Sequence, residues 1–483
     1  MKLKELIQKS RCCEYRGKDN PEISRVSTDS RKVSRGDIFV AIEGYRDNGI
    51  RYIEEAVKRG ACAVVVEERF RAQLEDVPGV PLCYTDSARR CALLLARAIY
   101  NFDTMSFSLI GVTGTNGKTT VTYLLEALLR ECNCNPGVIG TISYRYNQIE
   151  KKAHNTTPDP VELMGLFAGM AEGGVTHVIM EVSSHALAQD RVLPGDFDFA
   201  IFTNLSQDHL DYHGTMEEYG AAKARLFTGL EPAATAIINT DDPFGKTLTS
   251  MTGGRVVTYG LNYVCDYHAS IHSLSLTGTK FGVNGIRFST HLVGVHNVYN
   301  MLPAIAYAET VGLDRELVVR ALGNVRCIPG RFERVDNDRG FHIFVDYAHT
   351  PDALDHLLEA ANMLKDGRII TVFGCGGDRD KGKRPKMGRI VEEKSDLAII
   401  TSDNPRTEDP LLIIEDIKKG LRKNNHLIIP DRREAIYKAV ELAAPGDMVL
   451  IAGKGHEDYQ ILKDRTIHFD DREVALEALK RLS

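Results

Sequence analysis

The sequence predicts three consecutive α/β domains. Its 483 residues correspond to about three domains of ordinary size. Apolar strand-like runs alternate with helical stretches along the chain, a pattern that favours parallel sheets. A glycine-rich segment followed by Lys-Thr-Thr joins one such strand to a helix, as in phosphate-binding domains. Because open α/β sheets bind ligands at the carboxyl ends of their strands, we expect the functional residues there.

The first domain, residues 1–104, is predicted to be a small α/β unit. Two strands are expected in "GDIFVAIEG" (36–44) and "ACAVVVEE" (61–68), with the helix "YIEEAVKRG" (52–60) between them. A second helix is expected in "SARRCALLLARAIYNF" (87–102).

The second and third domains are predicted to span residues 105–329 and 330–483. The turn Pro329-Gly330 separates them. The central domain should hold a mainly parallel sheet, with strands in "FSLIGVTG", "THVIMEVSS", "DFAIFTNL" and "ATAIINTDD". The last domain should be Rossmann-like, with strands in "FHIFVDYAH", "GRIITVFGCGG", "SDLAIITSDNP" and "DMVLIAGKG".

The composition is that of an ordinary globular protein, with 43% apolar and 26% charged residues. A net charge of −6 argues against a general nucleic-acid binder. The ten cysteines are scattered without a C-x-x-C pair, and Cys12–Cys13 are too close for ordinary pairing, which favours a reduced set. The sequence has neither an apolar signal core nor a run of membrane-spanning length, so we expect a cytoplasmic location and no membrane insertion.

The segment "GVTGTNGKTT" (111–120) predicts a phosphate-binding loop, although Val112 stands where the usual G-x-x-x-x-G-K-[ST] pattern has glycine. A predicted strand precedes it and a helix with apolar residues at helical spacing follows it. Backbone N–H groups at the helix start and the Lys118 ammonium suit a triphosphate. Thr119 is placed to offer a hydroxyl to Mg²⁺. A plain glycine-rich turn is the alternative, and the Lys-Thr-Thr sequence argues against it.

Two further segments offer groups for the metal side of such a site. Glu181 ends an apolar strand, where nucleotide-hydrolysing enzymes often place a carboxylate serving Mg²⁺. The segment 203–227 contains His209 and Lys223. Imidazole is an unusual ligand for Mg²⁺, so these residues alone favour a hydrogen-bonded loop histidine. They likewise favour a solvated surface lysine at Lys223.

Taken together, the motifs resemble those of the Mur ligases, the ATP-dependent amide-forming enzymes of peptidoglycan synthesis. The resemblance covers nearly the whole chain, and the family loop T-G-T-N-G-K-[ST] needs no earlier glycine. The motifs occur in the family's order: "GTNGKTT", "EVSSHAL", "TNLSQDHLDYHGT", "AAKARLF", "GVHNVYN", "GRFE" and "DYAHTPD". One branch, which extends the dipeptide to a tripeptide, is indicated by "HNTTPDP", "GGDRDKGKRP", "DNPRTEDP" and "GKGHEDYQ".

The resemblance implies a reaction. ATP would activate the D-Glu γ-carboxylate of UDP-N-acetylmuramoyl-L-alanyl-D-glutamate as an acyl phosphate, and meso-diaminopimelate would then be added, with release of ADP and phosphate. It implies ATP and two Mg²⁺ ions as cofactors, a UDP-binding first domain, a P-loop ATPase centre and an amino-acid-binding last domain. We expect a monomer that has no nucleic-acid partner.

The resemblance also assigns residues to the nucleotide side of the site. Lys223 matches a lysine that becomes a carbamate (N6-carboxylysine), an anionic oxygen ligand, and so His209 becomes an expected ligand beside it. The metal set is then Thr119, Glu181, His209 and Lys223. The ATP set is Gly114, Thr115, Asn116, Gly117, Lys118, Thr119, Thr120, Asn297 and Arg331. The catalytic set is Lys118, Glu181, His209, Lys223, Arg331 and Asp346.

The two other substrates have their own sets. The nucleotide-sugar peptide is expected at Thr28, Ser30, Tyr45, Arg46, Asp47, Asn155, Thr156, Thr157, Ser183, Gln189 and Arg191. The incoming amino acid is expected at Arg379, Asp403, Asn404, Pro405, Arg406, Gly453 and Glu457. Diaminopimelate carries a carboxylate that L-lysine lacks, and the Arg406 guanidinium suits it. L-Lysine is the alternative if Arg406 only braces its loop.

Three other functions compete with this interpretation. A dinucleotide-dependent oxidoreductase is suggested by "FGCGGDRD", but Arg379 stands where G-x-G-x-x-G needs its last glycine. A P-loop switch would leave the "DNPR" and "GKGHE" motifs without a role. A folylpolyglutamate-synthetase-like ligase shares the ATPase core, whereas "STDSRK" (27–32) in the first domain favours a UDP-sugar substrate.

Overall fold

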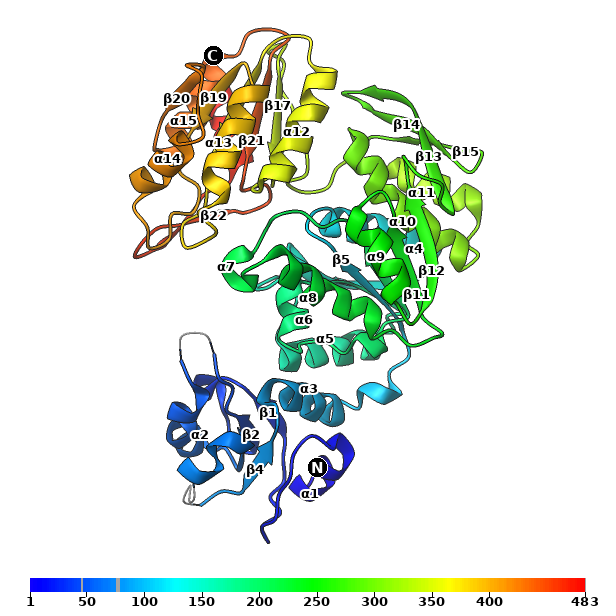
Figure 1. Ribbon diagram of the computed structural model, residues 1–483, viewed down its shortest axis with the longest axis vertical. Helices are drawn as coiled ribbons and strands as arrows, with labels where there is room; N and C mark the ends of the chain where they lie inside the picture. The colour runs from blue at the N-terminus through cyan, green and yellow to red at the C-terminus, as the bar shows by residue number, and fades with distance from the viewer. Residues whose placement is uncertain (45–46, 75–78, 483) are drawn as a thin grey trace.

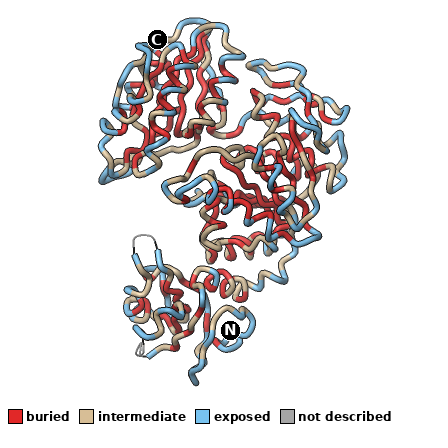
Figure 2. Tube along the Cα trace, in the orientation of Figure 1, coloured by how far each residue is buried: buried red, intermediate tan, exposed pale blue. Residues whose placement is uncertain are grey.

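The computed structural model describes residues 1–44, 47–74 and 79–482. Its strands form three main sheets of four, eleven and six strands, which follow one another along the chain and lie in three bodies (Figure 1). Each sheet is buried between helices, and exposed residues gather at the loops (Figure 2). The chain therefore has the mixed α/β architecture that the sequence predicts.

The first sheet is entirely parallel, in the order β1-β2-β3-β4. Its central strands are buried apolar runs, as expected of a parallel sheet covered by helices. Helix α3 packs against α1 and also against α5 of the next domain. The elements are α1 (Leu3–Ser10), β1 (Arg25–Ser27), β2 (Asp37–Val40), α2 (Ile53–Arg59), β3 (Ala63–Glu67), β4 (Leu82–Thr85) and α3 (Ala88–Ile99).

The central sheet has the order β15-β14-β13-β12-β11-β10-β5-β9-β6-β7-β8. The strands from β12 to β6 are parallel, as predicted, and antiparallel hairpins extend the sheet at both edges, which the sequence patterns do not indicate. The strands are β5 (Ser108–Thr113), β6 (Pro136–Ile139), β7 (Ser143–Tyr146), β8 (Ile149–Lys152), β9 (His177–Glu181), β10 (Phe199–Phe202), β11 (Thr235–Asn239), β12 (Arg255–Gly260), β13 (Tyr267–Ser275), β14 (Gly278–Val283) and β15 (Ile286–Thr290).

Helices cover both faces of this central sheet. On one face, α4 and α10 share an apolar cluster with Val112. On the other, α5 and α8 join α3 in a cluster that continues into the first domain. The helices are α4 (Lys118–Glu131), α5 (Pro160–Glu172), α6 (Ser184–Ala188), α7 (Leu210–His213), α8 (Met216–Thr228), α9 (Pro243–Met251), α10 (Val295–Thr310) and α11 (Arg315–Asn324).

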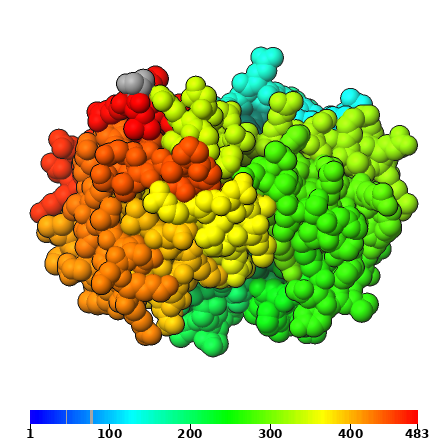
Figure 3. Space-filling view, turned by 90° about the horizontal axis from the view of Figure 1, so that it is seen from above, coloured from blue at the N-terminus to red at the C-terminus, as the bar shows by residue number. Residues whose placement is uncertain are grey.

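The last sheet has the order β16-β17-β21-β18-β19-β20, parallel except for β16. Its elements are β16 (Glu333–Val335), β17 (His342–Asp346), α12 (Pro351–Leu364), β18 (Ile369–Phe373), α13 (Lys383–Lys394), β19 (Leu397–Ile400), α14 (Pro410–Lys418), β20 (His426–Ile428), α15 (Arg432–Leu442), β21 (Met448–Ala452), the hairpin β22 (Tyr459–Ile461) and β23 (Thr466–His468), and α16 (Asp471–Arg481). Seen from above, the yellow surface of this domain meets the green central domain (Figure 3). In the described part of the chain, no helix is long and apolar enough to cross a membrane.

Candidate active site

The phosphate loop connects β5 to α4, and its glycines are required by its geometry. Gly114 and Gly117 have φ angles of +148° and +88°, which other residues rarely adopt. A Cβ on Gly114 would also lie 1.9 Å from the Thr203 hydroxyl oxygen. Val112, by contrast, is a fully buried residue of β5 that pairs with Glu181 of β9. The loop therefore begins after Val112, and a glycine there is unnecessary.

Lys118 is the first residue of α4 and lies within the loop. Its Nζ donates to the backbone oxygens of Gly114 and Thr115, both at 2.9 Å. Burial lowers the pKa of Lys118, and no carboxylate of the described residues lies within ion-pair distance of it. A cation without a counter-ion at a helix N-terminus suits an anionic ligand.

Glu181 ends β9 and connects the two sides of the site. Its buried carboxylate accepts hydrogen bonds from the hydroxyls of Thr119, at 3.0 Å, and Thr141, at 2.9 Å. The Thr141 hydroxyl in turn lies 3.0 Å from that of Thr156. A continuous chain of oxygen atoms thus leads from the phosphate loop to the expected peptide-binding segment. Thr120, beside Thr119, is buried in the first turn of α4.

Lys223 lies on α8 and is buried, with only 1% of its surface exposed, so the surface position that its sequence neighbourhood favours is wrong. The apolar neighbours Ala222, Ala224 and Leu226 pack α8 into the domain, which draws Lys223 inward. Its Nζ donates to the backbone oxygen of Gly114 at 2.8 Å. Burial, reinforced by the Lys118 charge, holds the pKa of Lys223 well below its usual value. Lys223 can therefore exist as a neutral amine next to the phosphate loop.

His209 lies at the start of α7 with a left-handed backbone, φ +54°. Its ring meets that of His185 edge to face, with centroids 4.8 Å apart, and its Nε2 lies 3.5 Å from the Asp208 carboxylate. Burial lowers the pKa of His209 to about 3, despite the opposing effect of Asp208. The imidazole is therefore neutral near pH 7 and has a lone pair for a ligand.

The last domain brings cationic and acidic groups to the same loop. Arg331 Nη2 donates to the Thr119 hydroxyl at 3.2 Å, and its guanidinium lies over the Tyr347 ring at 4.5 Å. Asp352, at the start of α12, accepts from the Asn116 side chain at 2.8 Å. Asp346 accepts from the backbone N–H of Phe332 and Ala348, and so holds the backbone beside Arg331. Burial raises the pKa of Asp346.

Asn297 of α10 and Thr115 of the loop itself bind other protein groups through their side chains. Asn297, buried on α10, donates to the Val293 backbone oxygen at 2.8 Å and accepts from Asn300. Thr115 contacts the Tyr219 hydroxyl at 3.2 Å. Both residues hold elements around the loop in this structure.

The residues expected to hold the muramoyl peptide lie together beyond Glu181. The Thr157 hydroxyl donates to the Glu181 backbone oxygen at 2.8 Å and accepts from the Ser183 N–H at 3.0 Å. Arg191 donates to the Thr157 backbone oxygen and to Gln189. Asn155 is held through its backbone by the Tyr144 hydroxyl. This part of the expected set therefore forms one hydrogen-bonded cluster.

The uridine-side residues lie on a different sheet, in the first domain. Thr28 follows β1, and the Ser30 hydroxyl donates to Glu55 at 3.1 Å. Asp47 accepts from the Tyr52 hydroxyl. Two other predicted contacts, Tyr45 and Arg46, lie outside the described residues.

The expected amino-acid site lies at the carboxyl end of the last sheet. Arg406, with φ +52°, is half-buried, and within the described residues its side chain donates to the backbone oxygens of Gly377 and Asn404. Burial and the nearby Arg379 lower its pKa. No carboxylate of the described residues forms an ion pair with it. Arg379 itself is exposed, and Pro405 continues the same loop.

Unlike Arg406, the charged side chains Glu457 and Lys454 of this site are paired with each other. Asn404 donates to the Glu457 carboxylate at 2.8 Å, and the fully buried Lys454 donates to the same carboxylate at 3.0 Å. Burial would raise the pKa of Asp403, but the Lys454 and Arg432 cations lower it. Gly453 has φ +119°, and a Cβ there would lie 2.7 Å from the Asp403 carboxylate.

Sequence reasoning missed Asp352 and Lys454, although both lie inside the motifs "DYAHTPD" and "GKGHEDYQ". A charged residue within such a motif could have been identified as a candidate site residue. Lys454 meets Glu457 three residues further along the same motif, whereas the partner of Asp352 depends on how two domains are arranged, which residue spacing does not encode.

Comparison with family models matches all three parts of the chain. A Mur ligase family catalytic domain matches residues 22–96, a Mur ligase middle domain residues 112–308, and a Mur ligase glutamate ligase domain residues 330–455. Curated relatives named UDP-N-acetylmuramoyl-L-alanyl-D-glutamate–2,6-diaminopimelate ligase include those of Halalkalibacterium halodurans and Aquifex aeolicus. The first is 44% identical over 95% of both chains, and the second 44% identical over 95% of this chain and 94% of its own.

Solved structures agree with these matches. One, of a UDP-N-acetylmuramoyl-L-alanyl-D-glutamate–2,6-diaminopimelate ligase, is 35% identical over 95% of both chains, with a TM-score of 0.65. MurF from Thermotoga maritima in complex with ADP is 20% identical over 95% of this chain and 98% of its own, with a TM-score of 0.64. Folylpolyglutamate synthase from Mycobacterium tuberculosis is 19% identical over 76% of this chain and 92% of its own, with a TM-score of 0.58. The last two likenesses are of fold alone.

Proposed function

The chain belongs to the Mur ligase family, and from this premise we propose that it joins meso-diaminopimelate to UDP-N-acetylmuramoyl-L-alanyl-D-glutamate at the expense of ATP. The curated relatives carry this activity in their names, and they match over 95% or more of this chain in the first five cases. Consumption of ATP supports a cytoplasmic location.

The observation that carries this proposal is the hydrogen-bonded chain from Thr119 through Glu181 and Thr141 to Thr156. Phosphoryl transfer from ATP to a substrate carboxylate requires the two reactants to meet in line. The phosphate loop begins this chain and the expected peptide segment ends it. Thus the two substrate sites adjoin at Glu181.

The donor set also fits Mg²⁺. Thr119 and Glu181 offer oxygen atoms, which hard cations prefer, and His209 is neutral. The Lys223 amine fits only after reaction with CO₂: its nitrogen lone pair bonds to carbon, one C=O electron pair moves to oxygen, and an N–H proton goes to solvent. The carbamate oxygens would then face the metal. Bound Mg²⁺ neutralises phosphate charge.

In the proposed reaction the D-Glu γ-carboxylate oxygen bonds to the γ-phosphorus of ATP, and the bond from that phosphorus to the bridging oxygen breaks, which gives an acyl phosphate and ADP. The diaminopimelate amine then attacks the acyl carbon, phosphate leaves, and the amine proton goes to solvent or substrate. Lys118, Arg331 and the loop N–H groups stabilise the transferred charge. His349 and His456 serve as positioning groups.

Contact between the last two domains protects the acyl phosphate. Asp352 on α12 accepts from Asn116 of the phosphate loop and from the Ser206 hydroxyl, at 2.8 and 3.0 Å. Gln207 donates to Asp380 at 3.1 Å at the same junction. These contacts bring the amino-acid domain over the loop, where water would otherwise hydrolyse the intermediate.

Arg406 supports diaminopimelate over L-lysine. A half-buried guanidinium without a carboxylate partner suits the extra carboxylate of diaminopimelate. In a lysine-adding enzyme it would face a cation or an empty space. The relatives' names agree with the same choice.

The test is phosphate release from ATP with Mg²⁺ and UDP-N-acetylmuramoyl-L-alanyl-D-glutamate, comparing meso-diaminopimelate with L-lysine. We expect release with diaminopimelate, little with lysine and none when either co-substrate is omitted. Preference for lysine would retain the ligase and overturn the role of Arg406. Release with neither amino acid, or release independent of both co-substrates, would overturn the proposed function.

A further inference from the structure

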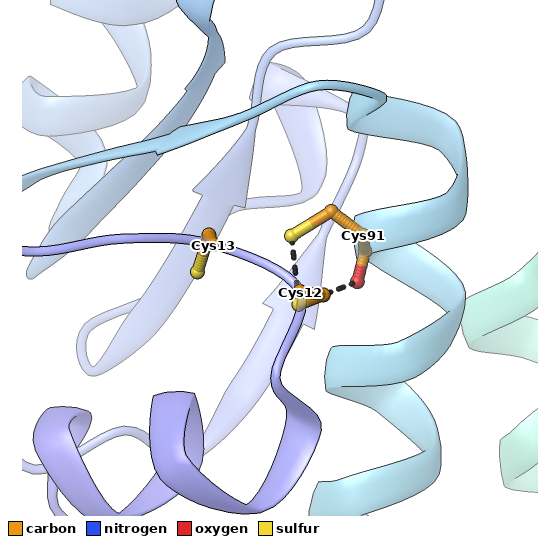
Figure 4. A group of neighbouring side chains, drawn as sticks. All are labelled: Cys12, Cys13 and Cys91. Atoms are coloured by element: carbon orange, nitrogen blue, oxygen red, sulfur yellow. Dashed lines mark hydrogen bonds between the residues drawn. The ribbon is translucent and has the colours of Figure 1, made fainter.

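Three cysteines of the first domain, none of them among the residues assigned to the candidate active site, come together (Figure 4). Cys12 and Cys13 lie on the segment that follows α1, and Cys91 lies on α3. The three sulfur atoms all lie within 4.8 Å of one another. The Sγ atoms of Cys12 and Cys91 are 2.9 Å apart, although 79 residues separate them in the chain.

The surrounding structure holds the cluster in place from both sides. The Thr85 hydroxyl at the end of β4 donates to the Cys12 backbone oxygen at 2.7 Å. Two residues further along, Glu14 pairs with Tyr84 through two backbone hydrogen bonds. Cys91 is buried on α3, whereas Cys12 and Cys13 are half-buried. The thiols are therefore positioned by backbone contacts and remain reachable from one side.

We propose that Cys12, Cys13 and Cys91 are the ligands of a binding site for a thiophilic metal ion, and that this ion is zinc(II). Zinc–thiolate bonds are about 2.3 Å long, so sulfurs that share one ion lie about 4 Å apart. The three sulfurs lie within 4.8 Å of one another, and the 2.9 Å separation of Cys12 and Cys91 would lengthen on binding. The fourth position would be filled by solvent or by the Ser10 hydroxyl, which lies 3.3 Å from the Cys12 sulfur. Binding displaces three thiol protons to solvent and requires no oxidant.

A redox-sensing pair explains the cluster less well. Such a pair needs two sulfurs and leaves the third thiol, Cys13, without a role. Reactive thiols also have lowered pKa values next to cations. Within the described residues, the hydrogen-bond partners of the Cys12 sulfur are Cys91 and Ser10, and no cation lies among them.

Because of the position of the cluster, metal binding would affect the stability of the first domain. Helix α3 packs on α1 and on α5 of the central domain, and its apolar residues belong to a core that both domains share. Zinc would tie the segment around residues 10–16 to this helix. Metal binding should therefore stabilise the first domain without altering the groups proposed for catalysis.

The experiment uses the full-length, reduced, metal-free protein, titrated with Co²⁺ as a spectroscopic probe and then with Zn²⁺ in competition with a chromophoric chelator. We expect one ion per chain with a thiolate-to-cobalt charge-transfer band, which an oxygen- and nitrogen-lined active site would not give. Zinc should also protect the three thiols from alkylation, as mapped by mass spectrometry. Cys12→Ser and Cys91→Ser should each weaken zinc binding by at least about a hundredfold, the upper end for groups outside the ligand set.

Cys62→Ser is the matched control, because Cys62 is a half-buried cysteine of the same domain that lies outside the cluster. Its zinc affinity should equal that of the unaltered chain. If Cys91→Ser fails to fold, Cys13→Ser tests the same point at a half-buried position. Absence of the thiolate band, or equal binding by the cluster variants and the control, would overturn the proposal. A Cys12–Cys91 disulfide in air, with no zinc binding by the reduced protein, would overturn it in favour of a redox pair.

Discussion

The central and C-terminal domains differ in whether their most deeply buried cations have carboxylate partners. In the central domain, Lys118 and Lys223 donate only to backbone oxygens and have no carboxylate within ion-pair distance among the described residues. In the C-terminal domain, Arg432 forms a fully buried ion pair with Asp471 at 2.7 Å. Arg384 likewise pairs with Glu408, at 2.8 Å, and with Asp416.

This difference distinguishes side chains that bind ligands from side chains that stabilise the fold. Burial lowers the pKa of Lys223, whereas the Asp471 carboxylate more than offsets burial and raises the pKa of Arg432. A buried cation without a counter-ion destabilises the protein unless an anion arrives. Arg406 is the C-terminal cation that follows the central pattern. By this criterion Lys118 and Arg406 bind anionic ligands, and Arg432 and Arg384 hold the fold. Lys223 is instead a buried amine whose lowered pKa suits the proposed carbamate.

The largest effect is expected at Lys223. Lys223→Ala should lower kcat by about 10²–10³-fold, the usual loss on removing one preorganised electrostatic group. Short carboxylic acids should restore part of the activity by supplying the oxygen ligand. Steady-state phosphate release measures both effects, and Lys246→Ala, at an exposed lysine of the same domain, is the control. Unchanged activity without any additive would contradict the proposed carbamate at Lys223.

Arg432 should instead matter for stability. Arg432→Met leaves Asp471 as an unpaired buried charge, which costs about 3–5 kcal/mol. The next residue provides the control: Arg433 pairs with Glu477 on the surface, and Arg433→Met should change stability by about 0–1 kcal/mol. Urea unfolding, followed by hydrogen exchange in the C-terminal domain, measures the difference. Equal losses in the two variants would contradict the division between scaffold and binding groups.

Replacing Arg406 should have a smaller effect on activity, and only with one of the two amino acids. Arg406→Lys removes a planar donor, and the loss of one charge-assisted hydrogen bond, about 1.5–3 kcal/mol, corresponds to about ten- to a hundredfold in kcat/KM. We expect this loss with diaminopimelate and almost none with L-lysine. Arg389→Lys, at an exposed ion pair on α13, serves as control. A loss shared equally by both amino acids would assign Arg406 to bracing its loop.

The smallest effect concerns acid stability, which buried histidines and Glu408 should lower in two different pH windows. Burial lowers the pKa of His185 to about 4 and that of His209 to about 3, so the unfolded central domain binds more protons below pH 6.5. Its stability should fall from pH 6.5 downward. Burial lowers the pKa of His456 in the C-terminal domain to about 3, so this upper window involves both domains. The Arg384 hydrogen bond lowers the pKa of Glu408 to about 2, so that contribution is lost only between pH 4.5 and 2.

Hydrogen exchange, measured across this pH range, tests the order of these losses. His185→Asn should reduce the loss below pH 6.5 in the central domain, and Glu408→Gln should remove the loss between pH 4.5 and 2 in the C-terminal domain. An unchanged pH dependence in either variant would contradict the assignment.

The sequence was most informative where function depends on local order. The alternation of strands and helices predicted the three-part α/β fold, and the Lys-Thr-Thr after β5 predicted the loop that α4 now follows. It did not predict the hairpins β7–β8 and β13–β15, because β8 and β13 are largely exposed and polar, and β7 and β14 contain no continuous apolar run. The residues around Lys223 favoured a surface position, since a lysine in a sequence carries no information on which side of α8 is covered. Only the resemblance to the Mur ligases predicted a role in the site for Lys223.

The sequence by itself determined which residue types stand at the strand ends and in what order the motifs follow, because both depend on neighbours within a few positions. Only the tertiary structure decided which of these groups meet. Arg331 reaches Thr119 across 212 residues, Asp352 reaches Asn116 across 236, and Cys12 meets Cys91 across 79. Such contacts follow from sheet order and from the docking of whole domains. Both minimise the free energy of the entire chain, so no short stretch of sequence specifies them.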